Sequence, residues 1–270
     1  RGKRDAVVTK LTTTGSIAFS TYLGGNGSDY PIFGALEISG NEVIIAGTTG
    51  SPGFPVTGSS LYKGGVSDGF VTKLNASDGS VISSQFFGGS NTDYVSSMLY
   101  ENGSVYVVGS TFSPDLPVTI GSPVNDTAEN GFITRLNTNN LAVIYARYLG
   151  GNKRDIITKS IVSDGMVHLT GFTGSTDYPV TNGTISSSQL NDNNDGFYTR
   201  LNPDGNIIYS TYLTTNDFDF PAQLLIADGD IYVGGTSVST INGMKSLLIH
   251  KINANGSIGF TKRFKIGLNN

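Results

Sequence analysis

The sequence predicts an all-β fold in which a unit of about 62 residues repeats along the chain. The tripeptide Thr9-Lys10-Leu11 returns four times at nearly constant spacing. The 270 residues include 36 Gly, about twice the average share, without the period of collagen. No stretch sustains a 3.6-residue apolar period. We therefore expect many short strands and turns, and almost no helix.

Three kinds of marker define the repeat. The tripeptide recurs, with Arg in place of Lys in two copies, at 72–74, 134–136, 199–201 and, degraded, at 250–252. Pro-Val-Thr occurs at 55–57, 117–119 and 179–181. Gly-Gly occurs at 24–25, 88–89 and 150–151 and becomes Thr214-Thr215 in the next copy. The last unit is shorter because it lacks the Pro-Val-Thr loop.

Each unit contains four predicted strands. In the second unit they cover 94–100, 104–111, 131–136 and 141–149, with a long loop over 112–130. Turn sequences support the first hairpin of successive units, since Asn102-Gly103, Asp164-Gly165 and Asp228-Gly229 are typical of two-residue hairpin loops. These signals favour four-stranded antiparallel sheets.

The second strand of each unit is predicted to be buried on both faces. When the repeats are aligned, consecutive positions of this strand are apolar, as in Val105, Tyr106 and Val107. Further along the strand every copy has a glycine, at position 47, 109, 171 or 235. A sheet with such a strand must be stacked between similar sheets, and radial repetition achieves this. The fold class that we predict is therefore a β-propeller, or part of one.

The repeat phasing predicts a single propeller domain over 1–270. Four complete blades cover 30–89, 94–150, 156–213 and 219–264, and residues 5–24 form the outer hairpin of an incomplete blade. An isolated outer hairpin exposes strand edges, which proteins avoid. The missing strands would come either from upstream of Arg1 or from a second copy of the chain.

Several segments carry a family resemblance. Asp68-Gly69-Phe70-Val71-Thr72-Lys73-Leu74-Asn75, the strand Ser104–Thr111 and Ser210-Thr211-Tyr212-Leu213 resemble the β-propeller repeats called SBBP repeats, and the likeness covers nearly the whole chain. The resemblance implies a propeller fold. It also implies a place in a large secreted or cell-surface protein of a bacterium or archaeon, with no defined enzymatic activity.

Composition excludes several classes of function. The net charge of −4 and a pI near 5.1 are not those of a nucleic-acid binder. The absence of Cys excludes disulfides, thiol catalysis and zinc–thiolate sites. No apolar run is long enough for a membrane span, and no apolar segment of a signal peptide follows Arg1. Six candidate N-glycosylation sites favour an extracellular or cell-surface protein, namely Asn26, Asn75, Asn102, Asn125, Asn182 and Asn255.

Four motifs suggest catalysis or metal binding, and each is better read as structural. Gly65-Val66-Ser67-Asp68-Gly69 fits a hydrolase elbow but leads into a strand rather than a helix. His168 and His250 occupy repeat columns of other residue types. Residues 24–29 match one calcium hexad without the tandem copies that share the ion, so we expect Asp29 to hold backbone N–H groups. Residues 191–196 are rich in oxygen donors but lack the EF-hand pattern, so we interpret them as a solvated loop, with a weak calcium site as the alternative. We therefore expect no cofactor in this protein.

Charges and aromatic residues repeat with the units. We expect each cation to pair with an Asp of its own or a neighbouring blade and to fix blade register, although a ring of cations that binds an anionic polymer is the alternative. The repeated charges are Lys10, Lys73, Arg135, Arg200 and Lys251, and Asp29, Asp93, Asp155 and Asp219. Two aromatic columns are expected in the core: Tyr22, Phe86, Tyr148 and Tyr212, and Tyr30, Tyr94 and Phe218.

These observations favour a non-enzymatic structural or adhesive module of a secreted or cell-surface assembly. Its expected partners are other subunits or further domains of the same protein, with glycans as a further candidate. The alternative is a carbohydrate-binding or carbohydrate-processing propeller. In either case binding is expected in the loops of variable length, which cover 50–67, 112–130, 174–195 and 236–245.

Overall fold

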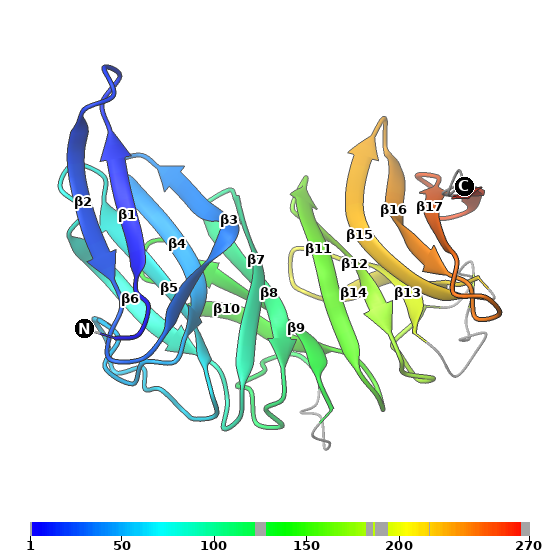
Figure 1. The fold of residues 1–270 in the computed structure, drawn as a ribbon, viewed down its shortest axis with the longest axis horizontal. Helices are drawn as coiled ribbons and strands as arrows, with labels where there is room; N and C mark the ends of the chain where they lie inside the picture. Colours follow the sequence, from blue (N-terminus) through cyan, green and yellow to red (C-terminus); the bar gives the residue numbers. More distant parts are fainter. Residues whose placement is uncertain (1, 122–127, 182–185, 187–193, 216, 266–270) are drawn as a thin grey trace. The chain divides into compact units, whose positions relative to one another are not determined.

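The computed structural model describes residues 2–121, 128–181, 186, 194–215 and 217–265, with only the backbone for 32–35. This part of the chain contains eighteen strands and no helix (Figure 1). The strands form four four-stranded antiparallel sheets and one two-stranded sheet. The predicted all-β fold built from four-stranded sheets is therefore confirmed.

Each four-stranded sheet is a meander of consecutive strands. The two-stranded sheet holds β1 (Ala6–Leu11) and β2 (Ile17–Leu23). The four larger sheets hold β3 (Asp29–Ser39), β4 (Glu42–Thr49), β5 (Asp68–Asn75) and β6 (Val81–Phe87); β7 (Asp93–Glu101), β8 (Ser104–Thr111), β9 (Asn130–Asn137) and β10 (Val143–Leu149); β11 (Asp155–Ser163), β12 (Met166–Thr173), β13 (Asp195–Leu201) and β14 (Ile207–Leu213); and β15 (Phe218–Ala227), β16 (Asp230–Val238), β17 (Lys245–Ile252) and β18 (Ile258–Lys265).

The chain divides into two compact units. The first comprises residues 1–127 and 133–146, and the second comprises 128–132 and 147–270. Each unit is described by itself below. The single domain over 1–270 and the blade limits that the repeat suggests stay predictions.

The hairpin turns have the backbone that their sequences predict. Asn102, Asp164 and Asp228 have φ angles of 49°, 54° and 52°, and the Gly that follows each also has a positive φ. Two successive residues of positive φ match the right-handed twist of the flanking strands, and Asn, Asp and Gly tolerate that conformation best. These turns therefore fix the register between the first two strands of three sheets.

The second strand is almost wholly buried in three sheets, as its apolar columns predict, but β16 of the last sheet is only partly buried. Every residue of β8 is buried, and in β4 only Glu42 is partly exposed. In the first unit, Ala6 and Val8 of β1 join Val43, Ile45 and Phe70 in one apolar core. In the second unit, Tyr198 and Leu213 share a core with Leu224, Ile231 and Val233. Sheets thus cover one another face to face.

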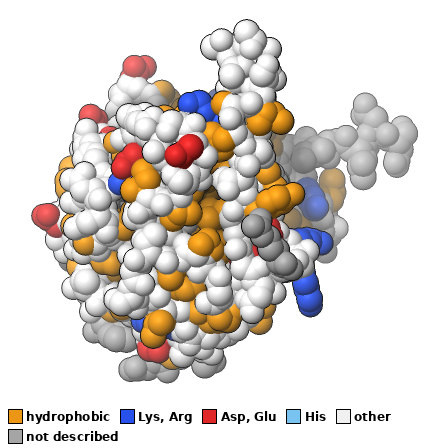
Figure 2. Space-filling model, turned by 90° about the vertical axis from the view of Figure 1, so that its left-hand side faces the viewer, with side chains coloured by type: hydrophobic (Ala, Val, Ile, Leu, Met, Phe, Trp, Pro, Cys, Tyr) orange, Lys and Arg blue, Asp and Glu red, His pale blue; other side chains and the backbone are white. Residues whose placement is uncertain are grey.

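The two-stranded sheet has one open edge. β1 pairs only with β2, whereas its equivalent β5 pairs with both β4 and β6. Val7 is consequently 56% exposed, while its equivalent Phe70 is fully buried. Figure 2 views the molecule from the side on which β1 and β2 lie in Figure 1, and hydrophobic side chains are spread over this face with few charged ones.

Two of the repeated cations, Lys10 and Lys73, connect one sheet to the next. The register of the last strand pair shifts directly after Lys10, Lys73, Arg200 and Lys251, which is a bulge that re-aims the side chain. The Lys10 ammonium donates to the Ala76 carbonyl, and the Lys73 ammonium donates to the Thr138 carbonyl, both at 2.7 Å. Ala76 and Thr138 are equivalent positions in successive repeats. Each lysine therefore fastens the turn of the following repeat.

Replacement of Lys73 by Met tests this fastening. Lys73 is buried and its ammonium also pairs with Glu42 Oε2 at 2.7 Å, so Met would leave a buried carbonyl and a carboxylate without their donor. We expect Lys73→Met to lower the free energy of unfolding by about 1–3 kcal/mol in urea denaturation. Lys10→Met is the matched control, since Lys10 makes the equivalent bond at an exposed position. Equal losses in the two variants, or none in Lys73→Met, would contradict this role.

Candidate functional site

Four buried aspartates organise the passages between sheets. Asp29, Asp93, Asp155 and Asp219 lie at or next to the start of the first strand of their sheets, and all are buried. In the first copy, Asp29 Oδ2 accepts from the Gly25 N–H and the Ser51 hydroxyl, each at 2.9 Å. Asp29 Oδ1 accepts from the Thr49 hydroxyl. Asp29 therefore receives one backbone N–H, from Gly25, and two side-chain hydroxyls.

The next two copies repeat this geometry. Asp93 Oδ2 accepts from the Gly89 N–H at 2.8 Å and the Ser113 hydroxyl at 3.2 Å. Asp155 Oδ2 accepts from the Gly151 N–H at 2.7 Å and from the hydroxyl of the serine that follows β12, at 2.8 Å. Burial raises the pKa of Asp93 and raises that of Asp155 to about 6, although these hydrogen bonds oppose the shift.

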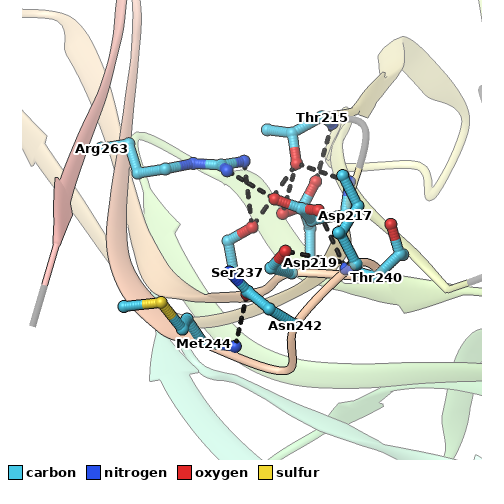
Figure 3. Close-up of polar contacts among 10 residues, drawn as sticks. Thr215, Asp217, Asp219, Ser237, Thr240, Asn242, Met244 and Arg263 are labelled. Atoms are coloured by element: carbon cyan, nitrogen blue, oxygen red, sulfur yellow. Dashed lines mark hydrogen bonds and ion pairs between the residues drawn. The ribbon is translucent and has the colours of Figure 1, made fainter.

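The fourth copy is built differently (Figure 3). The Thr215 N–H donates to Asp219 Oδ2 at 2.7 Å, and its hydroxyl donates to Asp219 Oδ1 at 2.9 Å. Arg263 of β18 pairs with Asp217 and donates to the Ser237 hydroxyl. Arg263 lies opposite Leu248, as Phe86 lies opposite Phe70, so an arginine replaces the repeated aromatic residue here. The contacts make this a structural cluster that ties the outer strand to the turn.

The expected pairing between repeated cations and repeated aspartates does not occur in the described part of the chain. Lys73 pairs with Glu42 and Lys251 pairs with Asp230, each at 2.7 Å. Arg135 donates to the Ser104 hydroxyl and lies over the Tyr106 ring. The reason is the sheet geometry: the cations lie at the end of the third strand, whereas the aspartates lie at the start of the first strand, close to the opposite end of the sheet.

The histidines are core residues rather than catalytic groups. His168 Nδ1 lies 2.7 Å from the Tyr198 hydroxyl, and His250 Nδ1 lies 2.9 Å from that of Thr261. Burial lowers the pKa of each to about 4, so both are neutral at pH 7. Each hydroxyl serves as the single partner that a buried neutral imidazole needs on that nitrogen.

The other motifs are also structural where the structure describes them. Ser67 lies in a turn before β5, and its hydroxyl donates to the Asp93 carbonyl, so no hydrolase elbow forms. Residues 191–193 of the candidate calcium loop lie outside the described residues. The described residues hold no cluster of three His, Asp or Glu side chains that could bind a metal. Within those same residues no helix is long and apolar enough to cross a membrane.

The candidate glycosylation sites differ in exposure. Asn26, Asn102 and Asn255 are exposed. Asn75 is half-buried, and its Oδ1 accepts from the N–H and the hydroxyl of Ser77 within an Asx turn. Asn125 and Asn182 lie outside the described residues. Modification of any of them stays a prediction.

A cavity of about 560 Å³ is the candidate binding site. Tyr30 of β3 and Tyr94 of β7 line it and are 45% and 43% exposed. Polar residues complete its wall, including Lys3, Ser28 and Ser67. The remaining lining residues are Gly27, Thr48, Gly50, Val66 and Val95. Residues of the variable loop over 50–67 therefore contribute to the wall, as expected for a binding loop.

Strand geometry explains why these tyrosines are exposed. Each follows a buried aspartate, Asp29 or Asp93, and side chains alternate between the two faces of a strand. The Val95 N–H donates to the Thr48 hydroxyl at 3.0 Å, which holds β7 against the end of β4 beneath the cavity. The Arg4 guanidinium lies 5.7 Å from the centre of the Tyr30 ring. Two aromatic faces with hydroxyls and cations nearby can bind polar ligands that carry apolar faces.

The expectation that both aromatic columns lie in the core is correct for only part of them. Phe86, Tyr148 and Tyr212 are buried, and Phe218 is partly buried. Tyr30 and Tyr94 are exposed at the cavity, and Tyr22 is exposed on the open two-stranded sheet. The position of Tyr30 and Tyr94 directly after an Asp at a strand start was the signal in the sequence that could have placed them on the exposed face.

Comparisons with known proteins identify the fold. The chain matches no protein-family model and no curated protein sequence. Among solved structures, it is similar to a quinohemoprotein alcohol dehydrogenase of Pseudomonas putida, with a TM-score of 0.51 at 9% identity over 96% of this chain and 50% of that chain. It is similar to a Synechocystis apocarotenoid oxygenase, with a TM-score of 0.51 at 10% identity over 98% of this chain and 57% of that chain. BamB from Moraxella catarrhalis gives a TM-score of 0.36 at 13% identity, over 98% of this chain and 72% of that chain.

These similarities support the β-propeller and correct one prediction. The fold class is a propeller of four-stranded antiparallel sheets, and the chain spans about half the length of the dehydrogenase and the oxygenase. The prediction that the chain is not an enzyme is overturned, because structures with this fold include an alcohol dehydrogenase and an oxygenase. The fold therefore gives no ground to exclude catalysis.

Replacement of His250 by Thr tests the burial of the histidines. The unfolded chain binds more protons than the folded chain between the folded pKa of about 4 and the unfolded value near 6.5, so stability falls as the pH falls through this window. Thr occupies the equivalent position as Thr72 and Thr199, which bond to serine hydroxyls at 2.8 Å. Protonation of His250 in the unfolded chain should lower the free energy of unfolding of the wild type by about 2 kcal/mol when the pH is lowered from about 7 to 5. In urea denaturation, His250→Thr should lack this part of the decrease. An unchanged pH dependence would contradict the low pKa.

Proposed function

We propose that this chain is an adhesive module of a secreted or cell-surface assembly and that it binds carbohydrate in the cavity between Tyr30 and Tyr94. The single observation that carries the proposal is the pair of exposed tyrosines at equivalent positions of two successive repeats, both lining one cavity. The SBBP-like repeats support the surface location, since such repeats are mostly found in large secreted or cell-surface proteins. The exposed Asn26, Asn102 and Asn255 agree with that location.

The chemistry of the cavity suits a sugar. The apolar face of a pyranose stacks on an aromatic ring, while its hydroxyls need donors and acceptors at the rim. Ser28, Thr48 and Ser67 supply hydroxyls around the two tyrosines, and Lys3 supplies a cation that would favour an acidic sugar. A rigid scaffold beneath the rings reduces the entropy that binding must offset.

A glycan array followed by calorimetry tests this function. We expect the chain to bind a defined class of glycans. Tyr30→Ala and Tyr94→Ala should each raise the dissociation constant about tenfold, which corresponds to about 1.4 kcal/mol of binding free energy. Tyr22→Ala is the matched control, because Tyr22 is also exposed but is not among the residues that line the cavity. Absence of glycan binding, or an equal loss in Tyr22→Ala, would reject the proposal.

A second candidate function, assembly through strand pairing, rests on a different observation. The open edge of β1 carries Val7 and Leu11, which are exposed although their equivalents Phe70 and Leu74 are buried. An inner hairpin of the same repeat type, from another segment or another copy, would cover this edge in the way that β4 covers β5.

Charge on this edge tests the assembly. Lysine blocks edge-to-edge pairing because it cannot be buried in a continued sheet. We expect the wild-type chain to form filaments or larger assemblies in negative-stain images and the double variant Val7→Lys, Leu11→Lys to remain monomeric by light scattering. Ile241→Lys serves as the control, since Ile241 is exposed in a loop between β16 and β17. Monomers from both the wild type and the double variant would rule out self-assembly through β1.

A further inference from the structure

A second aspartate lies beside each of the first two buried aspartates. Asp68 begins β5 and is fully buried, as is Asp93 at the start of β7. Asp68 Oδ2 accepts from the Lys63 N–H at 2.6 Å, but Asp68 Oδ1 has no hydrogen-bond partner although it is buried. A buried carboxylate oxygen without a partner is costly, so a further group is expected there.

The unpartnered oxygen and one oxygen of Asp93 both lie close to Gly88. A methyl group built on Gly88 would lie 2.5 Å from Asp93 Oδ2 and 3.0 Å from Asp68 Oδ1, so any side chain at position 88 would clash with both. Two carboxylates from different sheets therefore lie next to the same glycine. Carboxylate oxygens of two neighbouring side chains can share one hard cation.

The first repeat has the same arrangement. A methyl group built on Gly24 would lie 2.6 Å from Asp5 Oδ1 and 2.7 Å from Asp29 Oδ2. Asp5 Oδ1 is again buried and without a hydrogen-bond partner. In the next copy Asn130 stands at the position of Asp68, opposite Asp155 and beside Gly150. In the last copy Thr214 replaces the glycine, so its side chain takes part of the space.

We propose that Asp68 and Asp93, which meet next to Gly88, bind a calcium ion, and that Asp5 and Asp29, which meet next to Gly24, bind a second one. The oxygen donors suit a hard divalent cation, and two opposed carboxylates balance its charge. Two carboxylates are few ligands for calcium, so water would supply the rest of the coordination and the affinity would fall in the weak extracellular range, with a dissociation constant of about 10⁻⁴–10⁻³ M. The third copy has one carboxylate and binds more weakly.

Acidic groups outnumber basic groups around the Asp68–Asp93 pair. Asp115 and Tyr62 face the Asp68–Asp93 pair as well, and Lys63 is the cation that contributes a favourable charge. Burial, and then the proximity of Asp93, raises the pKa of Asp68 to about 7, and burial raises the pKa of Asp93.

Calorimetric titration of the chelator-treated chain with calcium chloride at about pH 7.5 tests the proposal. We expect two ions per chain, and Asp68→Asn should abolish one of them or weaken it at least tenfold. Asn occupies the equivalent position 130, so this variant is compatible with the fold. Asp204→Asn, in an exposed turn, is the matched control and should bind as the wild type does. No binding up to about 10 mM calcium, or unchanged binding in Asp68→Asn, would overturn the proposal.

A stability measurement separates a bound ion from a shared proton. An ion that binds the folded chain stabilises it by mass action, whereas a shared proton leaves the stability independent of calcium. Saturating calcium at about pH 7.5 should therefore raise the melting temperature of the wild type, and raise that of Asp68→Asn less. Equal melting temperatures of the wild type with calcium and with chelator would mean that a proton alone occupies the pair, and would overturn the proposal.

Discussion

A buried carboxylate at the start of the first strand sets the path by which the chain passes from one sheet to the next. It must receive hydrogen bonds because a buried charge without partners is expensive. Asp29, Asp93 and Asp155 obtain them from the N–H of a glycine in the preceding turn and from a serine that follows the second strand. Three segments that are distant in sequence therefore meet at one point, and the position of each first strand follows.

Much of the fold could be predicted because the repeat shows the same local pattern several times. The turns Asn102-Gly103 and Asp164-Gly165 and the apolar second strands such as Val105–Val108 each depend on nearest-neighbour geometry, which sequence reports directly. Repetition also revealed which charges matter. It did not reveal their partners. Lys73 bonds to Thr138, a residue 65 positions away, and its side chain is directed there by a bulge that the sequence pattern does not predict.

The parts of the site that the sequence did not disclose depend on contacts between repeats. Asp68 reads as the start of a strand motif, and only the folded chain brings it to Asp93. Tyr30 and Tyr94 read as core aromatics because they recur, yet recurrence is also what a surface made by two successive repeats requires. Repetition thus identifies constrained positions without telling whether the constraint is packing or binding.

The lysine bonds that run from one repeat to the following turn give the structure a direction. Lys10 reaches Ala76 and Lys73 reaches Thr138, so each bond forms only after about one further repeat has been synthesised. A chain that emerges from the ribosome at about 5–20 residues per second would leave each of these two lysines without its carbonyl acceptor for several seconds. The contacts that fasten the two-stranded sheet and the sheet of β3–β6 are therefore completed only once the next repeat has emerged.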